Sequence, residues 1–306
     1  MSMQLVFSQI LIILIYVAVG FGAGKLHLID ANQRKFLSKL CSDLFLPFMI
    51  LAATSRDLSA KDVSNMAVAA TVGFFVMLST TLLSLLYHKI TKAGRERRAV
   101  VTALVTYPNS GFLGIPLCMA LFGEIAVLYG ALMIVIFNAL FFTLQYILFL
   151  PEKPNLKNLC TPATFSTILM LIMLSFGLHF PDPVQTGISG IGSILSPLSL
   201  IVIGVMLSEN KLSRIFTEKT SYIVVLIRNL LIPVAVILLF KLLPLDDTSS
   251  LCMMVYLGCP CATLTTIYAM QLDLEPTLCV NSVLLSTLCF SFTLPLIILI
   301  GQFLLH

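Results

Sequence analysis

The sequence predicts an all-α membrane protein in which ten transmembrane helices form two inverted five-helix repeats. Three observations predict this class: the composition, the number of long uncharged segments, and a proline-interrupted segment that recurs at a nearly constant offset. Hydrophobic residues make up 58% of the 306 residues and charged residues only 10%, whereas soluble domains are about a quarter charged. The composition therefore indicates a polytopic membrane protein.

Ten segments of the sequence are long and apolar enough to cross a membrane, which takes about 20 helical residues for about 30 Å of hydrocarbon. Eight contain no Asp, Glu, Lys or Arg, and two contain isolated charges: Lys39 and Asp43 in one, Arg228 in the other. The uncharged segments are 1–24, 63–87, 99–123, 125–151, 158–181, 183–208, 248–272 and 276–305, and the other two are 36–55 and 220–240.

The basic residues are divided unequally between the two sets of loops. Loops that follow odd-numbered spans contain 14 Lys and Arg residues when Lys39, near the start of the second span, is counted with them. The other loops and both termini contain only Arg56 and Lys61, with Lys241 assigned to the end of a span. Because cytoplasmic loops are enriched in Lys and Arg, we expect a multi-pass protein of the cell inner (plasma) membrane with both termini outside the cytoplasm. The net charge of +4 then reflects topology, and we expect no nucleic-acid partner.

Prolines recur at one offset in the two halves of the chain. Pro197 follows Pro47 by 150 residues, and Pro260 follows Pro108 by 152. We therefore expect residues 1–150 and 160–306 to be structural repeats. Since five spans is an odd number, the second repeat enters the membrane from the opposite face, and the repeats are inverted.

Two of the recurring prolines interrupt long apolar spans, within residues 107–116 and 258–266. A proline removes a backbone donor and clashes with the preceding turn, and freed backbone groups survive in a membrane only where protein buries them or where they line a wet cavity. In inverted-repeat carriers such broken helices form the substrate site, with half-helix N-termini directed at anionic groups. Alternatively, the prolines are ordinary kinks, but their recurrence in both halves favours a site.

The side chains at these breaks suit a carboxylate, because they offer amide, hydroxyl and thiol groups beside released backbone N–H groups. Two buried amides in neighbouring spans are further candidates, with helix-to-helix hydrogen bonding as the alternative interpretation. The predicted substrate-binding residues are Pro108, Asn109, Ser110, Gly111, Asn138, Arg228, Cys259, Pro260, Cys261, Thr263 and Asn281.

Arg228 and Asp43 are ionisable residues inside predicted spans, and such residues are functional candidates by default. We expect them either to form a buried pair or to serve separately, Arg228 as the counter-charge of an anion and Asp43 as a cation or proton site. The alternative for Arg228 is that its long side chain reaches back to the cytoplasmic surface.

Enzymatic and metal-dependent functions are disfavoured by the residues that are available. Asn109-Ser110-Gly111 superficially resembles the setting of a serine nucleophile, but no histidine lies deep enough in a span to act as its base. Cys259-Pro260-Cys261 is too closely spaced for a zinc site. We therefore expect neither an enzyme nor a bound metal or cofactor, other than a coupling proton or sodium ion.

The segment 109–117, Asn-Ser-Gly-Phe-Leu-Gly-Ile-Pro-Leu, resembles the fourth-helix motif of the auxin efflux carrier family, whose bacterial members are permeases for malate, malonate or auxin-like acids. Weaker likenesses extend over the whole chain. They are Phe45-Leu46-Pro47 in the second helix, Pro197-Leu198 with Ile203-Gly204 in the seventh, Arg228 with Pro233 in the eighth, and Pro260 with Ala262 and Ala269 in the ninth.

This resemblance implies ten helices in which helices 4 and 9 cross at their proline breaks. It also implies a scaffold of helices 1, 2, 6 and 7, a transport domain of helices 3–5 and 8–10 that moves as an elevator, and a homodimer formed through the scaffold. Asn109 would bind the substrate carboxylate. The chain departs from the family in the ninth helix, where Cys259-Pro260-Cys261 and threonines replace the amide of some members.

Together these inferences predict a secondary transporter of small organic anions, whose partners are an organic acid and the lipid bilayer. Two alternatives remain open at the level of sequence. One is a sodium-coupled organic-anion symporter of the bile-acid type, which has a similar crossover architecture. The other is a membrane-embedded sensor that binds an acid without transporting it.

Overall fold

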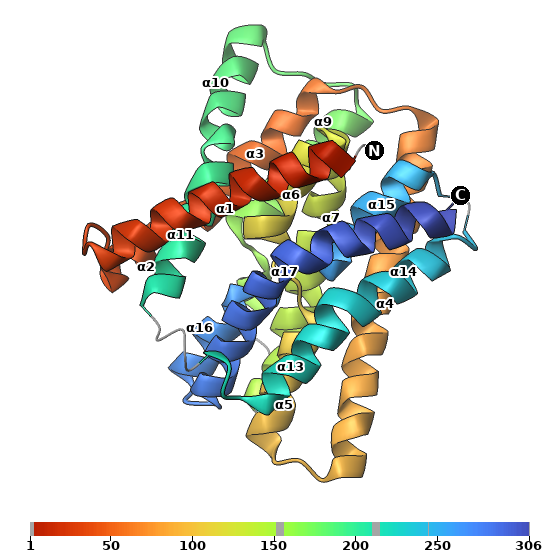
Figure 1. Cartoon of the computed structure of the whole chain (residues 1–306). Helices are drawn as coiled ribbons and strands as arrows, with labels where there is room; N and C mark the ends of the chain where they lie inside the picture. Colours follow the sequence, from red (N-terminus) through yellow and green to blue (C-terminus); the bar gives the residue numbers. More distant parts are fainter. Residues whose placement is uncertain (1–2, 151–155, 210–214, 244, 306) are drawn as a thin grey trace. The chain divides into compact units, whose positions relative to one another are not determined.

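The structure is a computed structural model that describes residues 3–150, 156–209, 215–243 and 245–305, most of which are helical (Figure 1). Within these ranges there is no β-strand beyond one isolated bridge. The helices are α1 (Met3–Lys25), α2 (Ala31–Leu40), η1 (Cys41–Phe45), α3 (Leu46–Ala52), η2 (Ala53–Ser55), α4 (Ala60–Thr91), α5 (Arg95–Thr106), η3 (Ser110–Gly114), α6 (Ile115–Phe122), α7 (Ile125–Leu140), η4 (Phe141–Gln145), α8 (Tyr146–Phe149), η5 (Leu156–Leu159), α9 (Pro162–Ser175), α10 (Asp182–Ser193), α11 (Leu195–Ser208), α13 (Lys219–Leu226), η6 (Ile227–Leu231), α14 (Ile232–Phe240), α15 (Asp247–Gly258), α16 (Thr263–Gln271) and α17 (Pro276–Leu305).

Seven helical segments in the described part of the chain are long and apolar enough to cross a membrane, which confirms a multi-pass α-helical membrane protein. The other three predicted spans consist of shorter helices: α5 with α6, α9 alone, and α15 with α16. The count of ten crossings and the inverted arrangement stay predictions. The seven long segments are Gln4–Lys25, Ala31–Ser55, Ala60–Thr91, Ile125–Phe149, Asp182–Ser208, Lys219–Phe240 and Pro276–Leu305.

Three of the four π-helical turns in the described residues precede a proline. Pro47, Pro116 and Pro233 each lie two residues after the end of a π-helical turn, namely η1, η3 and η6 respectively. A proline cannot donate to the preceding turn and clashes with the carbonyl four residues before it, and a wider turn accommodates both problems. One of these wide turns, η6, contains Arg228.

The predicted breaks at Pro108 and Pro260 are confirmed. Helix α5 ends at Thr106 and α15 ends at Gly258. The next residue of each, Tyr107 or Cys259, has an extended ψ angle, 112° and 152° respectively, because a residue before proline is excluded from the helical region. Each helix resumes only after the proline.

The contacts of the chain divide it into two compact units, each built from segments of both sequence halves. Unit 1 comprises Met1–Ala67, Gly111–Val135 and Cys160–Lys211, and unit 2 comprises Val68–Ser110, Ile136–Leu159 and Leu212–His306. The assignment of residues 1–150 and 160–306 as repeats, and the division into a scaffold and a transport domain, stay predictions.

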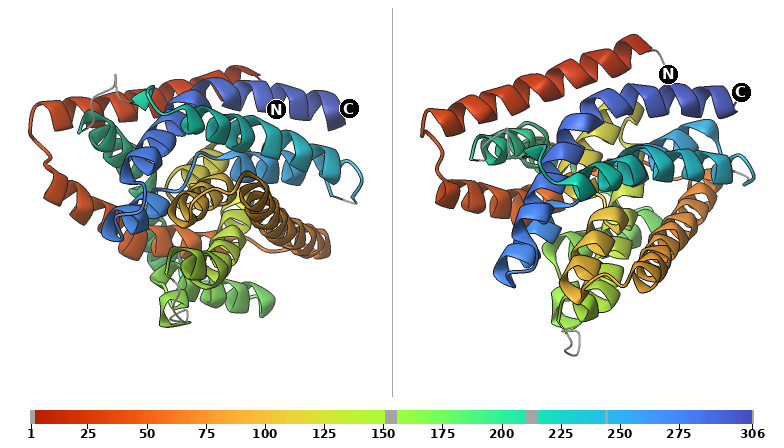
Figure 2. Two further views of the ribbon diagram at one scale, coloured as in Figure 1. Left: turned by 90° about the horizontal axis from the view of Figure 1, so that it is seen from below. Right: turned by 60° about the horizontal axis from the view of Figure 1, so that its bottom comes forward.

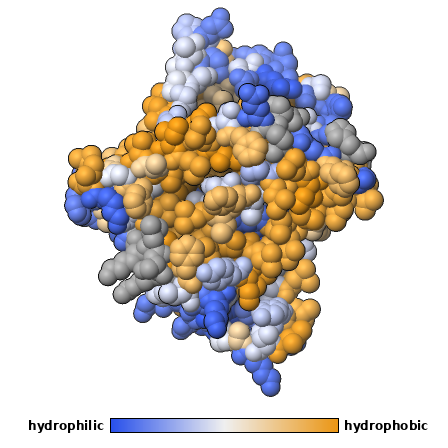
Figure 3. Space-filling model, viewed as in Figure 1, coloured by the Kyte–Doolittle hydropathy of each residue, from blue (hydrophilic) through white to orange (hydrophobic). Residues whose placement is uncertain are grey.

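In unit 1, α1 packs closely along α11, and glycines permit this approach. A side chain at Gly204 would overlap the Val17 carbonyl oxygen, and one at Gly20 would overlap the Ile201 carbonyl oxygen. The other face of α1 exposes large apolar side chains, including Phe7, Leu11, Leu14, Ile15 and Val19, and hydrophobic residues cover this helix in Figure 3. Such a face suits contact with lipid.

In unit 2, the helices that flank the broken segments pack against α17, which contacts α5, α15 and α16. Figure 2 shows α13 and α14 running beside α17, and each of them contacts α17. At the first break, Tyr107 makes edge-on contacts with Phe137 and Phe141, each with ring centroids 5.1 Å from that of Tyr107. This packing holds the residues around Pro108 and Pro260, which form the candidate site.

Candidate functional site

The two helix breaks of unit 2 are hydrogen-bonded to each other. The backbone N–H of Asn109 donates to the Pro260 carbonyl at 2.8 Å, and that of Ala262 donates to the Tyr107 carbonyl at 3.0 Å. Pro108 and Cys261 thereby form an isolated antiparallel bridge. Backbone groups that the prolines release from two helices, over 150 residues apart in sequence, thus satisfy each other in the interior of the unit.

Arg228 binds the carbonyl ends of both broken helices. Its Nε donates to the Cys259 carbonyl at 2.9 Å, and its Nη1 donates to the carbonyls of Val105 at 2.9 Å and Thr106 at 3.1 Å. Its Nη2 donates to the Leu257 carbonyl. The last carbonyls of a helix have no intrahelical partner and carry its negative dipole end, so the guanidinium satisfies and neutralises the ends of α5 and α15.

These contacts revise the predictions for the two ionisable residues. Arg228 is only 1% exposed, so the alternative that its side chain reaches back to the cytoplasmic surface is wrong. Asp43 is exposed and accepts a hydrogen bond from Ser42 at 3.0 Å. It belongs to unit 1 and Arg228 to unit 2, so a pair between them stays a prediction. Separate roles for Arg228 and Asp43 stay a prediction.

Asn109 has a buried side-chain amide that the protein leaves unsatisfied. The residue is 4% exposed, and its Nδ2 has no hydrogen-bond partner among the described residues. The fully buried Thr265 hydroxyl is likewise without a partner in the described part of the chain. An unsatisfied buried polar group costs about 1–3 kcal/mol, so it is rarely retained without a reason.

The N-terminus of α16 adds backbone donors beside the bridge. The helix begins at Thr263, and its cap residue, Ala262, supplies no side-chain hydrogen bond. The first N–H groups of such a helix lack intrahelical partners and lie at its positive dipole end. The broken segments therefore present ends of opposite polarity: the carbonyl ends of α5 and α15, which Arg228 binds, and the N–H end of α16. Of these, the N–H end of α16 is the one that can bind an anion.

Comparison with known proteins identifies the family of the chain. Two segments of the chain, residues 5–155 and 146–298, match the family described as membrane transport protein. The chain belongs to this family. It is also 24% identical over 307 residues to an uncharacterized transporter of Methanocaldococcus jannaschii, an alignment that covers 97% of this chain and 98% of the relative. The resemblance to the auxin efflux carrier family is thus confirmed, and both matches are with transporters rather than enzymes.

The remaining predicted site residues of this membrane transport protein are placed as follows. Ser110 is buried beside Asn109, and Cys259, Pro260 and Cys261 are buried in or next to the bridge. Thr263 is half-buried at the start of α16. Asn138 and Asn281 are buried in α7 and α17, whereas Gly111 is half-buried and belongs to unit 1. Contact of any of them with substrate stays a prediction.

Sequence reasoning missed two residues that support the bridge. The Ser286 hydroxyl accepts a hydrogen bond from the Cys261 N–H at 3.1 Å, and the Asn229 amide donates to the Ser286 carbonyl at 2.7 Å. Both residues are fully buried. Two signals in the sequence point to them: Asn229 is polar and follows Arg228, and Ser282 and Ser286 are four residues apart, on one helix face.

Proposed function

We propose that this membrane transport protein is a secondary transporter that carries small carboxylates across the membrane by alternating access. The observation that carries the proposal is the buried, unsatisfied amide of Asn109, next to a bridge whose other strand leads into the N-terminus of α16. A carboxylate supplies the acceptors that these donors lack. Membership in a transport family, and similarity to a transporter, support movement of the bound acid rather than its conversion.

In the proposed mechanism, the Asn109 side-chain N–H donates to one carboxylate oxygen, and the first backbone N–H groups of α16 donate to the other. Hydrogen bonds to a charged group contribute about 1.5–3 kcal/mol each, so a few suffice for the modest affinity that a carrier needs. Arg228 acts at the opposite polar end, where it neutralises the carbonyls of α5 and α15 that would otherwise repel an anion.

The proposal also covers the moving part of the protein, its oligomeric state, the coupling site and its orientation in the membrane. Unit 2, which contains the paired breaks, carries the substrate as an elevator, and the protein acts as a homodimer. Asp43 is the candidate for a coupling proton or cation, since it is the acidic residue within the predicted spans. Both termini lie outside the cytoplasm, as the distribution of basic residues predicts.

The deciding experiment is counterflow in proteoliposomes loaded with unlabelled acid, followed by currents on a supported membrane for a panel of mono- and dicarboxylates at varied sodium and pH. Asn109→Ala should raise KM by about 10- to 100-fold, the loss of one hydrogen bond to a charged group. Asn32→Ala is the matched control, because Asn32 is an exposed amide on α2. Binding without counterflow under any gradient would instead indicate a sensor, and normal transport by Asn109→Ala would refute the site.

A further inference from the structure

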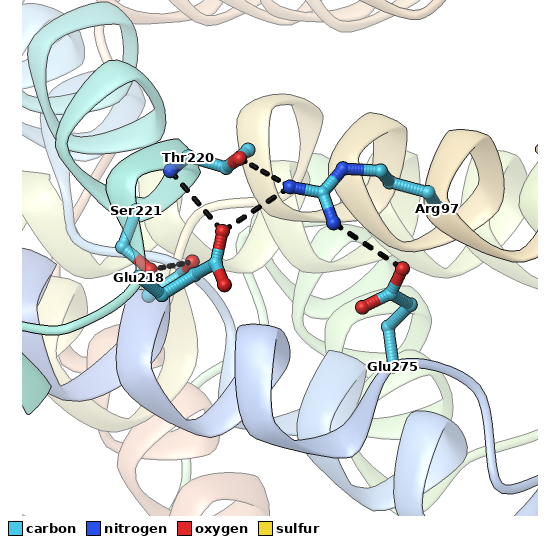
Figure 4. Close-up of polar contacts among 6 residues, drawn as sticks. Arg97, Glu218, Thr220, Ser221 and Glu275 are labelled. Atoms are coloured by element: carbon cyan, nitrogen blue, oxygen red, sulfur yellow. Dashed lines mark hydrogen bonds and ion pairs between the residues drawn. The ribbon is translucent and has the colours of Figure 1, made fainter. Parts of the chain in front are cut away.

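Arg97 joins three helices of unit 2 through one guanidinium (Figure 4). Its Nη2 donates to the Glu218 carboxylate at 3.1 Å and to the Thr220 hydroxyl, and its Nη1 donates to the Glu275 carboxylate at 3.3 Å. The Glu218 carboxylate also accepts the backbone N–H of Thr220 at 3.3 Å. We call these four residues the Arg97 tie.

All members of the Arg97 tie lie at helix N-termini. Arg97 is in the first turn of α5, Glu218 caps α13, and Glu275 immediately precedes α17 and accepts the Cys279 N–H through its carbonyl. The three helices pack against one another. Their positive dipole ends therefore lie together, and the two carboxylates offset both these ends and the guanidinium. The arrangement is stable only with the helices aligned at this end.

The same three helices also carry residues that hydrogen-bond at the two helix breaks. These residues lie at similar distances along their helices from Arg97, Glu218 and Glu275. Thr106 follows Arg97 by nine residues, Arg228 follows Glu218 by ten, and Ser286 follows Glu275 by eleven. At 1.5 Å per residue this is about 14–17 Å along each helix. At that level Arg228 donates to the Thr106 carbonyl at 3.1 Å and Asn229 donates to the Ser286 carbonyl at 2.7 Å.

A further contact lies between the tie and the breaks. The hydroxyls of Ser221 on α13 and Ser282 on α17 are 2.9 Å apart and fully buried. A slip of one helix by one residue would move its groups by about 1.5 Å, enough to break the hydrogen bonds at both levels. The alignment at the N-termini and the geometry of the breaks are therefore linked.

We infer that Arg97 is a positioning residue: by fixing the axial alignment of α5, α13 and α17, it sets the geometry of the paired breaks and so the presentation of the Asn109 amide. The inference rests on the proposed function only where it concerns transport. Its structural part can be tested without any substrate, because two thiols, those of Cys259 and Cys261, lie buried at the second break.

The first test is the rate at which N-ethylmaleimide labels each cysteine of the full chain in liposomes, read by peptide mass spectrometry. In Arg97→Gln, Cys261 should be labelled about three to ten times faster than in the wild type. Partly exposed ion pairs shift an equilibrium by a factor of about this size, here the equilibrium between aligned and misaligned helices. Lys89→Gln removes a charge from an exposed residue near the end of α4 and should change nothing. Cys41 and Cys118, buried in unit 1, report any general loosening.

The second test asks whether the tie acts as one group. Glu218→Gln should also speed labelling of Cys261, and the double variant with Arg97→Gln should be no faster than Arg97→Gln alone. Raising the salt concentration should speed labelling in the wild type but not in Arg97→Gln, since salt screens exposed charges. Arg97→Lys should restore part of the protection, because an ammonium carries the charge without the bidentate fork.

Transport supplies the third test. In counterflow with radiolabelled malate, Arg97→Gln should raise KM while kcat changes less, and Lys89→Gln should match the wild type. Unchanged labelling of Cys261 in Arg97→Gln would overturn the inference, as would an equal increase at Cys41 and Cys118. If labelling changes as expected but even the wild type carries none of the acids tested, the proposed function fails and the positioning role of Arg97 stands.

Discussion

Asn109 and Arg228 are both buried polar residues of unit 2, but the protein satisfies only one of them. Arg228 donates to four carbonyls, whereas Nδ2 of the Asn109 amide has no partner among the described residues. Removing a hydrogen-bonded partner leaves other buried groups unpaired, whereas removing an unpaired group leaves none. Substitution of Arg228 should therefore destabilise the protein, whereas substitution of Asn109 should not, although both disturb the site.

We predict that Arg228→Met lowers Tm by about 10 °C, because it leaves the carbonyl ends of two helices uncapped and unpaired. Asn109→Ala should leave Tm unchanged or slightly higher. Thermal unfolding in detergent can be followed with a thiol-reactive dye, since the chain has no Trp but has eight Cys, six of them buried. Equal destabilisation by both substitutions would contradict the distinction between a structural arginine and a ligand-binding amide.

Glu218 lies just before a membrane-spanning helix, and its environment predicts a pH dependence. Burial raises the pKa of Glu218, but hydrogen bonds from Thr220 and Arg97 and the charge of Arg97 outweigh this and hold the pKa below its ordinary value of 4.5. A lowered pKa in the folded state means that the carboxylate contributes stability above about pH 4.5, and that this contribution disappears as the pH falls through the folded value.

The Tm of the wild type should therefore exceed that of Glu218→Gln at pH 7, and the difference should narrow below pH 4.5. Glu96→Gln is the control, because Glu96 is an exposed glutamate in the first turn of α5, next to Arg97. The Tm of Glu96→Gln should stay close to that of the wild type at every pH. A gap between wild type and Glu218→Gln that stays constant from pH 7 to pH 4 would show that the carboxylate charge contributes nothing.

The sequence is sufficient to single out Asn109 and Arg228, because polar residues within apolar spans are conspicuous. It cannot reveal their roles. The carbonyls that Arg228 binds are backbone groups 29 to 123 residues away along the chain, and every residue type offers the same carbonyl. Only the fold determines which of them the guanidinium reaches, so a buried arginine that caps two helices cannot be distinguished in sequence from one that binds an anion.

At the scale of helices, prolines explain much of what could be predicted. Their positions locate the breaks after α5 and α15, and the wide turns that precede Pro47, Pro116 and Pro233 follow from the same chemistry. The bridge between Pro108 and Cys261 could be predicted only through the family resemblance, because no local pattern specifies which freed N–H meets which freed carbonyl.

The packing of α1 on α11 in unit 1 gives a prediction for whole helices. Gly204→Val should destabilise the protein by about 1–3 kcal/mol, because its side chain would overlap the backbone of α1 at Val17 and Phe21. Gly22→Ala, on the same helix pair, has open space around the added methyl and should be neutral or stabilising by about 0.5–1 kcal/mol. The dye-based Tm measures both, and equal effects would contradict the close approach of the two helices.

For the whole molecule, composition was enough to predict a multi-pass α-helical membrane protein, and the motif at residues 109–117 was enough to predict its family. The two compact units could not be predicted from the residues alone. Each draws on three separate stretches of the chain, and spans that are apolar on most faces carry little information about their neighbours, since lipid and protein are equally apolar surroundings.

The orientation of the molecule in the membrane follows from its loops and can be tested with residues of unit 1. Cys160 is exposed and lies just before α9, near the start of the sixth predicted span, whereas the exposed Ala60 lies between the second and third predicted spans. If the 14 basic residues of the odd loops are cytoplasmic, an impermeant maleimide should label Cys160 in inside-out vesicles only. The added thiol of Ala60→Cys should react in right-side-out vesicles only. Labelling of both from one side would mean that the number of crossings between them is even, and would exclude the predicted arrangement of three.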